Sequence, residues 1–176
     1  VISFKGIKQG IENTNYLLKS KNKKYILTIF EKRVLQKEIP FFMKLMDNLN
    51  NSKINCPKPL KTRNNKYLIK LKNKTACIVS FLEGKDKKIL NINDCYTVGK
   101  TIARMHVVTN KMKLYRKNSM GIKNLKPLLE SIKFKSKKFS HLKVFLNNNL
   151  KDINRYWPKQ LPKGVIHGLS LIHISE

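Results

Sequence analysis

The fold is decided by residues 3–33, which read SFKGIKQGIENTNYLLKSKNKKYILTIFEKR. Three short runs rich in apolar and β-branched residues alternate here with turn-forming residues, and they lie at about 1–5, 14–19 and 24–30. Glycines separate the first two runs, and Lys-Asn-Lys at 21–23 separates the last two. This pattern predicts three successive antiparallel strands, joined by a glycine-containing loop and then by a hairpin turn.

A helix and a second hairpin follow these strands. Apolar residues recur at the helical spacing i, i+3, i+4 and i+7, at Phe42, Leu45, Met46 and Leu49, and Pro40 is tolerated in a first helical turn. Two further strands are predicted at about 67–71 and 75–82, joined through Asn73 and Lys74. The first part of the chain should therefore form a five-stranded antiparallel sheet with one helix.

The remainder of the chain has helical periodicity. We expect a helix capped by Asn93 and running to about 109, with Val98, Ile102 and Met105 turned inward. A weaker helix is predicted at 125–134, and a stronger one is capped by Ser140 and ended by Pro158. The apolar side of that last helix comprises Leu142, Phe145, Leu146, Leu150, Ile153 and Trp157.

Strands followed by helices indicate an α+β fold of two lobes. We expect a small lobe at 1–84 with a hinge near 80–84, and a partial helical lobe at 85–168.

The net charge of +28, from 38 Lys and Arg against 10 Asp and Glu, raises the possibility of a nucleic-acid-binding module. The basic residues are nearly all lysines spread along the whole chain, which favours a solvated surface over a one-sided basic face. Three cysteines without a C-x-x-C pair argue against a disulfide framework or a zinc site and fit a reducing cytoplasm. No apolar run is long enough to span a membrane, so no membrane partner is expected.

Residues 6–15, GIKQGIENTN, form the loop between the first two predicted strands. Glycines and backbone N–H groups in such a loop can admit a phosphate chain, although an ordinary hairpin loop has the same composition. The loop is not a Walker A motif, because no Gly-Lys-Ser/Thr follows it.

The order of glycine loop, third strand, helix and hairpin is that of a kinase small lobe. With its elements in this order, the chain resembles the homoserine kinases of alphaproteobacteria, within the aminoglycoside-phosphotransferase-like superfamily. The resemblance covers about residues 2–168 and rests on SFKGIKQGIENTNYLL, YILTIFEKR, IPFFMKLMDNL, INCPKP, ACIVSFLEG, VGKTIARMH and LPKGVIHG. It implies a protein-kinase-like fold and ATP-dependent phosphorylation of the homoserine hydroxyl in threonine biosynthesis. A kinase of another small alcohol or amino-alcohol is the alternative within the same fold.

The resemblance also implies which residues hold ATP. The phosphates would lie under a loop made of Gly10, Ile11, Glu12, Asn13, Thr14 and Asn15. Adenine would be held by the backbone of Ser80, Phe81 and Leu82. Thr28 occupies the position where many kinases have a strand lysine, which leaves the phosphate-binding cation unassigned. Glu38 would orient a cation, although an acid near a helix N-terminus is also stabilised by the helix dipole alone.

The segment LPKGVIHG at 161–168 resembles the start of the family's catalytic loop, so His167 is the candidate catalytic-loop residue. Family members continue with a base aspartate and then with residues that bind Mg²⁺, whereas this chain has Leu169. Residues 169–176 resemble no part of the family and are interpreted as a non-native tail. We therefore expect this chain to be an inactive N-terminal fragment of a working kinase.

Overall fold

A computed structural model describes residues 1–8, 13–31, 35–84, 87, 89–118, 121–132, 139–158 and 160–166. The chain divides into two compact units, which are described separately. The first comprises Val1–Tyr115 together with the chain from Gly164, and the second comprises Arg116–Lys163.

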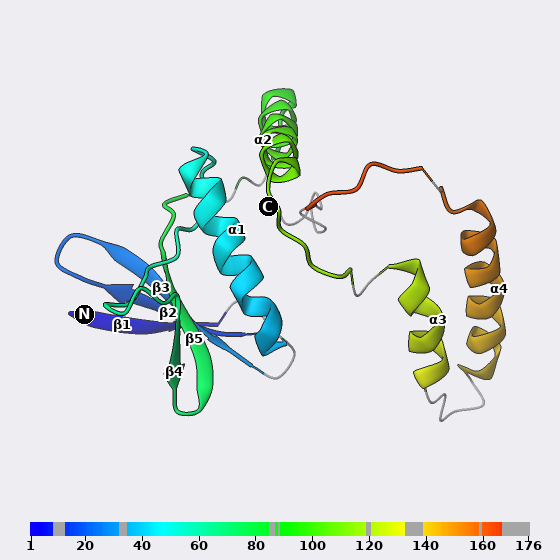
Figure 1. Cartoon of the computed structure of the whole chain (residues 1–176), viewed down its shortest axis with the longest axis horizontal. Helices are drawn as coiled ribbons and strands as arrows, with labels where there is room; N and C mark the ends of the chain where they lie inside the picture. The colour runs from blue at the N-terminus through cyan, green and yellow to red at the C-terminus, as the bar shows by residue number, and fades with distance from the viewer. Residues whose placement is uncertain are drawn as a thin grey trace. The chain divides into compact units, whose positions relative to one another are not determined.

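The first unit contains a five-stranded antiparallel sheet with the order β1-β2-β3-β5-β4 (Figure 1). The strands are β1 Ser3–Ile7, β2 Asn13–Lys19, β3 Lys24–Phe30, β4 Leu68–Leu71 and β5 Lys74–Ser80. The predicted number and antiparallel arrangement of the strands are confirmed, and β3 has the predicted bounds. Each of the other four strands differs from its prediction at one or both ends.

Strand pairing explains where the predicted ends were wrong. β1 starts and ends two residues later than predicted because Ser3 pairs with Lys19 and Ile7 pairs with Asn15. The β4–β5 turn consists of Lys72 and Asn73, one residue earlier than predicted, and these two residues have φ values of 45° and 65°. Positive φ at both central residues is the backbone that a two-residue type I′ hairpin requires.

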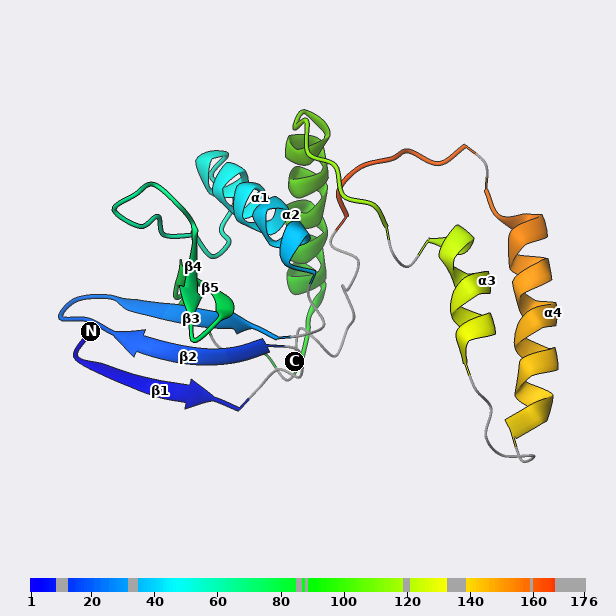
Figure 2. The same ribbon diagram turned by 60° about the horizontal axis from the view of Figure 1, so that its bottom comes forward.

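One helix covers one face of this sheet. The short 3₁₀ helix η1, Gln36–Glu38, leads into α1, Ile39–Asn51, which has Pro40 in its first turn as predicted. Ile39 and Met43 of α1 pack with Cys77 and Val79 of β5, and all four are buried. Figures 1 and 2 show α1 lying along the sheet beside these strands. Further side chains packed against this core are Ile26, Phe30, Phe42, Met46, Tyr67 and Leu68.

Helix α2, Ile92–Asn110, begins two residues earlier than a cap at Asn93 predicts. The cap is Asn91, whose side chain accepts the N–H of Asp94, while the Asp94 carboxylate accepts the N–H of Asn91. This reciprocal capping box satisfies two backbone donors that the first helical turn leaves without partners. Val98, predicted to face inward, is 44% exposed.

The second unit is a pair of helices, α3 Ile122–Ser131 and α4 Ser140–Tyr156, which contact each other. The N-cap of α4 is Phe139, so the predicted cap residue Ser140 is the first helical residue. The predicted apolar side of α4 is largely open, since Phe145 is 60% exposed and Trp157 is 47% exposed within this structure. None of the described helices combines the length and apolar character that crossing a membrane requires.

Candidate functional site

The predicted site residues Asn15 and Thr28 lie opposite each other on β2 and β3. The Thr28 hydroxyl donates a hydrogen bond to Asn15 Oδ1 at 2.8 Å. Side chains alternate between the faces of a strand, so Thr28 shares the α1 face of the sheet with Ile26 and Phe30, which pack against the core. The bond fixes the Asn15 amide with its oxygen toward Thr28 and leaves its two N–H donors available, because no other described residue bonds to them.

Thr14 lies on the opposite face, where it contacts Glu31, the residue directly after β3. The Thr14 hydroxyl donates to Glu31 Oε1 at 2.9 Å, and Lys74 Nζ lies 2.6 Å from Glu31 Oε2. The backbone N–H of Glu31 also donates to Asn13 Oδ1 at 3.4 Å. The hydrogen bond from Lys74, followed by that from Thr14, lowers the pKa of the Glu31 carboxyl below its ordinary value.

Glu31 and Lys74 were not among the residues that the sequence predicted for the site. Their contact follows from the register of β3 against β5, in which Ile29 pairs with Ala76. Extending that register by two residues places Glu31 opposite Lys74. The signal in the sequence was an acid just beyond one strand and a lysine at the start of another, which is informative only once the register is known.

At the far end of the sheet, Ser80 ends β5 and pairs with Tyr25. Its N–H donates to the Lys58 carbonyl and its Oγ accepts the Lys58 N–H, each at 2.9 Å. The N–H of Phe81 donates to the Lys24 carbonyl at 3.2 Å. Among the described residues, no hydrogen bond engages the backbone N–H of Leu82. Leu82 therefore offers an open backbone donor in this predicted hinge.

Glu38 is the N-cap residue of α1 and is half-buried. Its backbone N–H donates to the Leu35 carbonyl at 2.8 Å. The neighbouring Gln36 accepts a hydrogen bond from Lys70 Nζ at 3.2 Å, and the same ammonium lies 3.0 Å from Thr75 Oγ1. Lys70 of β4 thus contacts the turn before α1. The expected role of Glu38 in orienting a cation stays a prediction.

The remaining predicted residues Gly10, Ile11, Glu12 and His167, like Leu169, lie outside the described residues. The segment just before His167 is described and lies in the first unit. There the hydroxyl of Thr109, which is 3% exposed at the end of α2, donates to the Val165 carbonyl at 3.4 Å.

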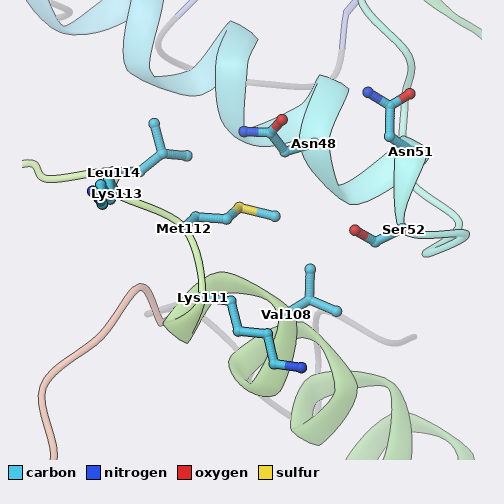
Figure 3. Close-up of a pocket in the computed structure, with 8 residues that line it drawn as sticks. All are labelled: Asn48, Asn51, Ser52, Val108, Lys111, Met112, Lys113 and Leu114. Atoms are coloured by element: carbon cyan, nitrogen blue, oxygen red, sulfur yellow. The ribbon is translucent and has the colours of Figure 1, made fainter.

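A cavity of about 570 Å³ opens between the ends of α1 and α2. Figure 3 shows the Met112 side chain lying between the two helix ends. The residues that line the cavity are Asn48, Asn51, Ser52, Val108, Lys111, Met112, Lys113 and Leu114. None of the predicted site residues that the structure describes lines this cavity.

The comparison with protein families finds a match to the phosphotransferase enzyme family over residues 3–168. Among curated proteins, the chain is 37% identical to a homoserine kinase of Rhodopseudomonas palustris (strain BisA53). It is 39% identical to a homoserine kinase of Paramagnetospirillum magneticum (strain AMB-1). Each match covers 95% of this chain and 52% of the relative, so the chain spans about half the length of the curated relatives it matches.

Solved structures with a similar backbone include spectinomycin phosphotransferase in complex with ADP and spectinomycin. That match has a TM-score of 0.47 and 16% sequence identity, and it covers 86% of this chain and 49% of the other. An AMP-bound complex of spectinomycin phosphotransferase gives a TM-score of 0.49 at 15% identity, covering 93% of this chain and 55% of the other.

Proposed function

The chain belongs to the phosphotransferase enzyme family, and on this basis we propose that it is the nucleotide-binding half of an ATP-dependent homoserine kinase. In this proposal the longer protein phosphorylates the side-chain hydroxyl of L-homoserine on the route to threonine. The observation that carries the proposal is the 37% and 39% identity to two homoserine kinases across 95% of the chain. Because the chain spans about half of those relatives, we assign the homoserine site to the longer protein.

The sheet suits the length of a nucleotide. Asn15 pairs with Thr28 and Ser80 pairs with Tyr25, so the proposed phosphate and adenine ends are three residues apart along β3. That separation is about 10 Å at the rise of an antiparallel strand. It leaves room for a ribose between a base at the hinge and phosphates at the loop. We therefore propose that ATP lies along β3, with its base toward Leu82.

The described residues fit both ends of ATP. Leu82 would bond adenine through its backbone N–H, because the N–H of Phe81 is already used by the Lys24 carbonyl. At the other end, the Asn15 amide would donate to a phosphate oxygen, since Thr28 holds the amide oxygen. Thr28 stands where many kinases have a strand lysine. The neutral Asn15–Thr28 pair would therefore help to orient the phosphates in place of that lysine.

The chemical step needs residues beyond this half. ATP is used as its Mg²⁺ complex in this chemistry, yet the described residues include no group of three His, Cys, Asp or Glu side chains suited to a metal ion. We therefore propose that the Mg²⁺ ligands, with the base aspartate, follow Gly168 in the longer protein. Without that aspartate, transfer should be about 10²–10⁴-fold slower.

We propose a nucleotide-binding lobe at 1–84, a partial helical lobe at 85–168 and a tail at 169–176 that is foreign to the family sequence. A reducing cytoplasm fits the cysteines, because Cys56, Cys77 and Cys95 are all free thiols.

Two experiments test the proposal separately. The first titrates this chain with ATP by calorimetry, with GTP and free phosphate as comparisons, and we expect saturable binding of ATP. The second sequences the source gene across the codons for His167 and Glu176. If an aspartate codon and a longer frame follow Gly168, the encoded protein should form ADP only when homoserine is added. Equal activity with ethanolamine or serine would overturn the homoserine assignment, and the absence of ATP binding would overturn the nucleotide site.

A further inference from the structure

The geometry points to Glu31 as a positioning residue that fastens the carboxyl end of the proposed phosphate loop to the sheet, with Lys74 as its partner. We call the contacts of Glu31 with Asn13, Thr14 and Lys74 the Glu31 clasp. This inference rests on the proposed function, since the loop at 10–15 is a phosphate loop only if the chain binds ATP. It adds two residues that lie outside the predicted phosphate and adenine contacts.

The clasp joins three strands at one point. Asn13 and Thr14 begin β2 directly after the loop, Glu31 follows the end of β3, and Lys74 begins β5. The two carboxylate oxygens of Glu31 are used separately, Oε1 for the Thr14 hydroxyl at 2.9 Å and Oε2 for Lys74 Nζ at 2.6 Å. A third contact, from the Glu31 N–H to Asn13 Oδ1, ties down the neighbouring residue as well. Both residues that leave the loop are therefore held by one side chain and its backbone.

An ionised carboxylate is the group suited to this position. It accepts hydrogen bonds at both oxygens, whereas a glutamine offers one oxygen and would turn an N–H group toward either Thr14 or Lys74. A glutamate carboxyl is ionised at neutral pH at its ordinary pKa, and the hydrogen bonds from the Lys74 ammonium and the Thr14 hydroxyl lower the pKa of Glu31 further. Lys74 thus holds one oxygen of Glu31 in place while the other oxygen accepts the Thr14 hydroxyl.

The clasp lies apart from the hydrophobic core. The core cluster is on the α1 face of the sheet, whereas Thr14 and Glu31 follow the alternation of Ile29 on the opposite face. The Lys74 and Glu31 side chains are 53% and 33% exposed. Exposed ion pairs contribute little to global stability. The effect of the clasp should therefore be local. It should make the start of β2 and the loop before it better ordered, with little change in global stability.

The test compares Glu31→Ala, Glu31→Gln, Lys74→Met and Lys74→Arg in the full 176-residue chain. Asp152→Asn on α4 is the matched control, because it removes the same charge from an exposed position. Amide hydrogen exchange at residues 13–15 measures how often the start of β2 opens locally, and calorimetric titration measures ATP affinity. Urea unfolding of the same samples measures global stability.

We expect Glu31→Ala to accelerate exchange at residues 13–15 and to weaken ATP binding by about two- to fivefold, the range typical of exposed charged contacts. Glu31→Gln and Lys74→Met should give exchange rates and ATP affinities between those of Glu31→Ala and the unsubstituted chain. Lys74→Arg should retain the exchange rate and the ATP affinity of the unsubstituted chain. The control should match the unsubstituted chain, and the urea midpoints should change little.

The outcomes separate this inference from the proposed function. If the unsubstituted chain binds ATP and Glu31→Ala matches it in exchange and affinity, the clasp is overturned while the nucleotide site stands. If Glu31→Ala lowers affinity only in proportion to a lower urea midpoint, the positioning role is also overturned. If the unsubstituted chain binds no ATP, the proposed function fails and the clasp loses its role toward phosphate, whatever the exchange rates are.

Discussion

Replacing Thr28 by valine tests whether the Asn15–Thr28 pair belongs to the nucleotide site. Valine keeps the β-branched shape of threonine, so β3 and its packing beside Cys77 should be preserved. The substitution removes only the hydroxyl that donates to Asn15 Oδ1 at 2.8 Å. The Asn15 amide is then free to rotate, and its N–H groups are no longer held in one direction.

The two expected effects differ in size. A neutral hydrogen bond contributes about 0.5–1.5 kcal/mol to stability, and this pair is only partly buried, so water can replace part of the loss. The free energy of unfolding should fall by less than about 1 kcal/mol. ATP affinity should fall by about twofold if the Asn15 amide samples two orientations equally. It should fall by about tenfold if a charge-assisted bond of about 1.5 kcal/mol is lost.

Calorimetric titration with ATP and urea unfolding on the same preparations measure both quantities. Thr28→Ser is the control, because it retains the hydroxyl and should bind ATP nearly as well as the unsubstituted chain. The reasoning is refuted if Thr28→Val remains folded and binds ATP with unchanged affinity. In that case the pair supports the sheet without contacting the nucleotide.

Two further predictions concern the core. Ile39→Ala should lower the free energy of unfolding by about 2–5 kcal/mol in urea, because Ile39 is fully buried, whereas Ile92→Ala, at a residue 88% exposed, should change it by less than about 0.5 kcal/mol. Equal effects would contradict the position of the core. Burial raises the pKa of Cys77 from 9.0 to about 11, so its contribution to stability is complete below about pH 9 and is lost as the pH rises toward 11. Urea unfolding at pH 7.5 and pH 10.5 should show that the free energy of unfolding falls by on the order of 2 kcal/mol in the unsubstituted chain but not in Cys77→Ala. An equal fall in both proteins would assign the loss to other titrating groups.

Much of the sheet could be predicted because its strands are bounded by strong turn signals. β3 lies between the Lys-Asn-Lys turn and a charged segment, and its bounds match the prediction. The bounds of β1 depend on the residues with which it pairs, and periodicity within one strand contains no information about its partner. Similarly, the turn at Lys72 and Asn73 was placed one residue late because Asn73 and Lys74 have the same turn-like composition.

The start of α2 was a missed signal in the sequence. Asn91 and Asn93 are both suitable caps, but only Asn91 has an acid three residues later, at Asp94, to complete a capping box. The outward position of Val98 could not be predicted in this way, since an apolar residue at helical spacing does not reveal what covers it. On α4 the same limit applies to Phe145 and Trp157.

For the site, sequence reasoning selected Asn15 and Thr28 separately, and the structure joins them by a hydrogen bond. It did not select Glu31 or Lys74, because a contact between residues 43 positions apart depends on the β3–β5 register. The predicted contributions of Glu38 and His167 remain predictions.

The order of strands in the sheet also has a consequence for how the chain folds. The pairs β1–β2, β2–β3 and β4–β5 are neighbours in the sequence, so each can form as a local hairpin. Only β3–β5 pairing closes a long loop, and that loop contains α1. Closing it carries the largest entropic cost in the sheet. We therefore expect the hairpins to form early and the β3–β5 seam, with the core that α1 places over it, to complete the folding of this unit.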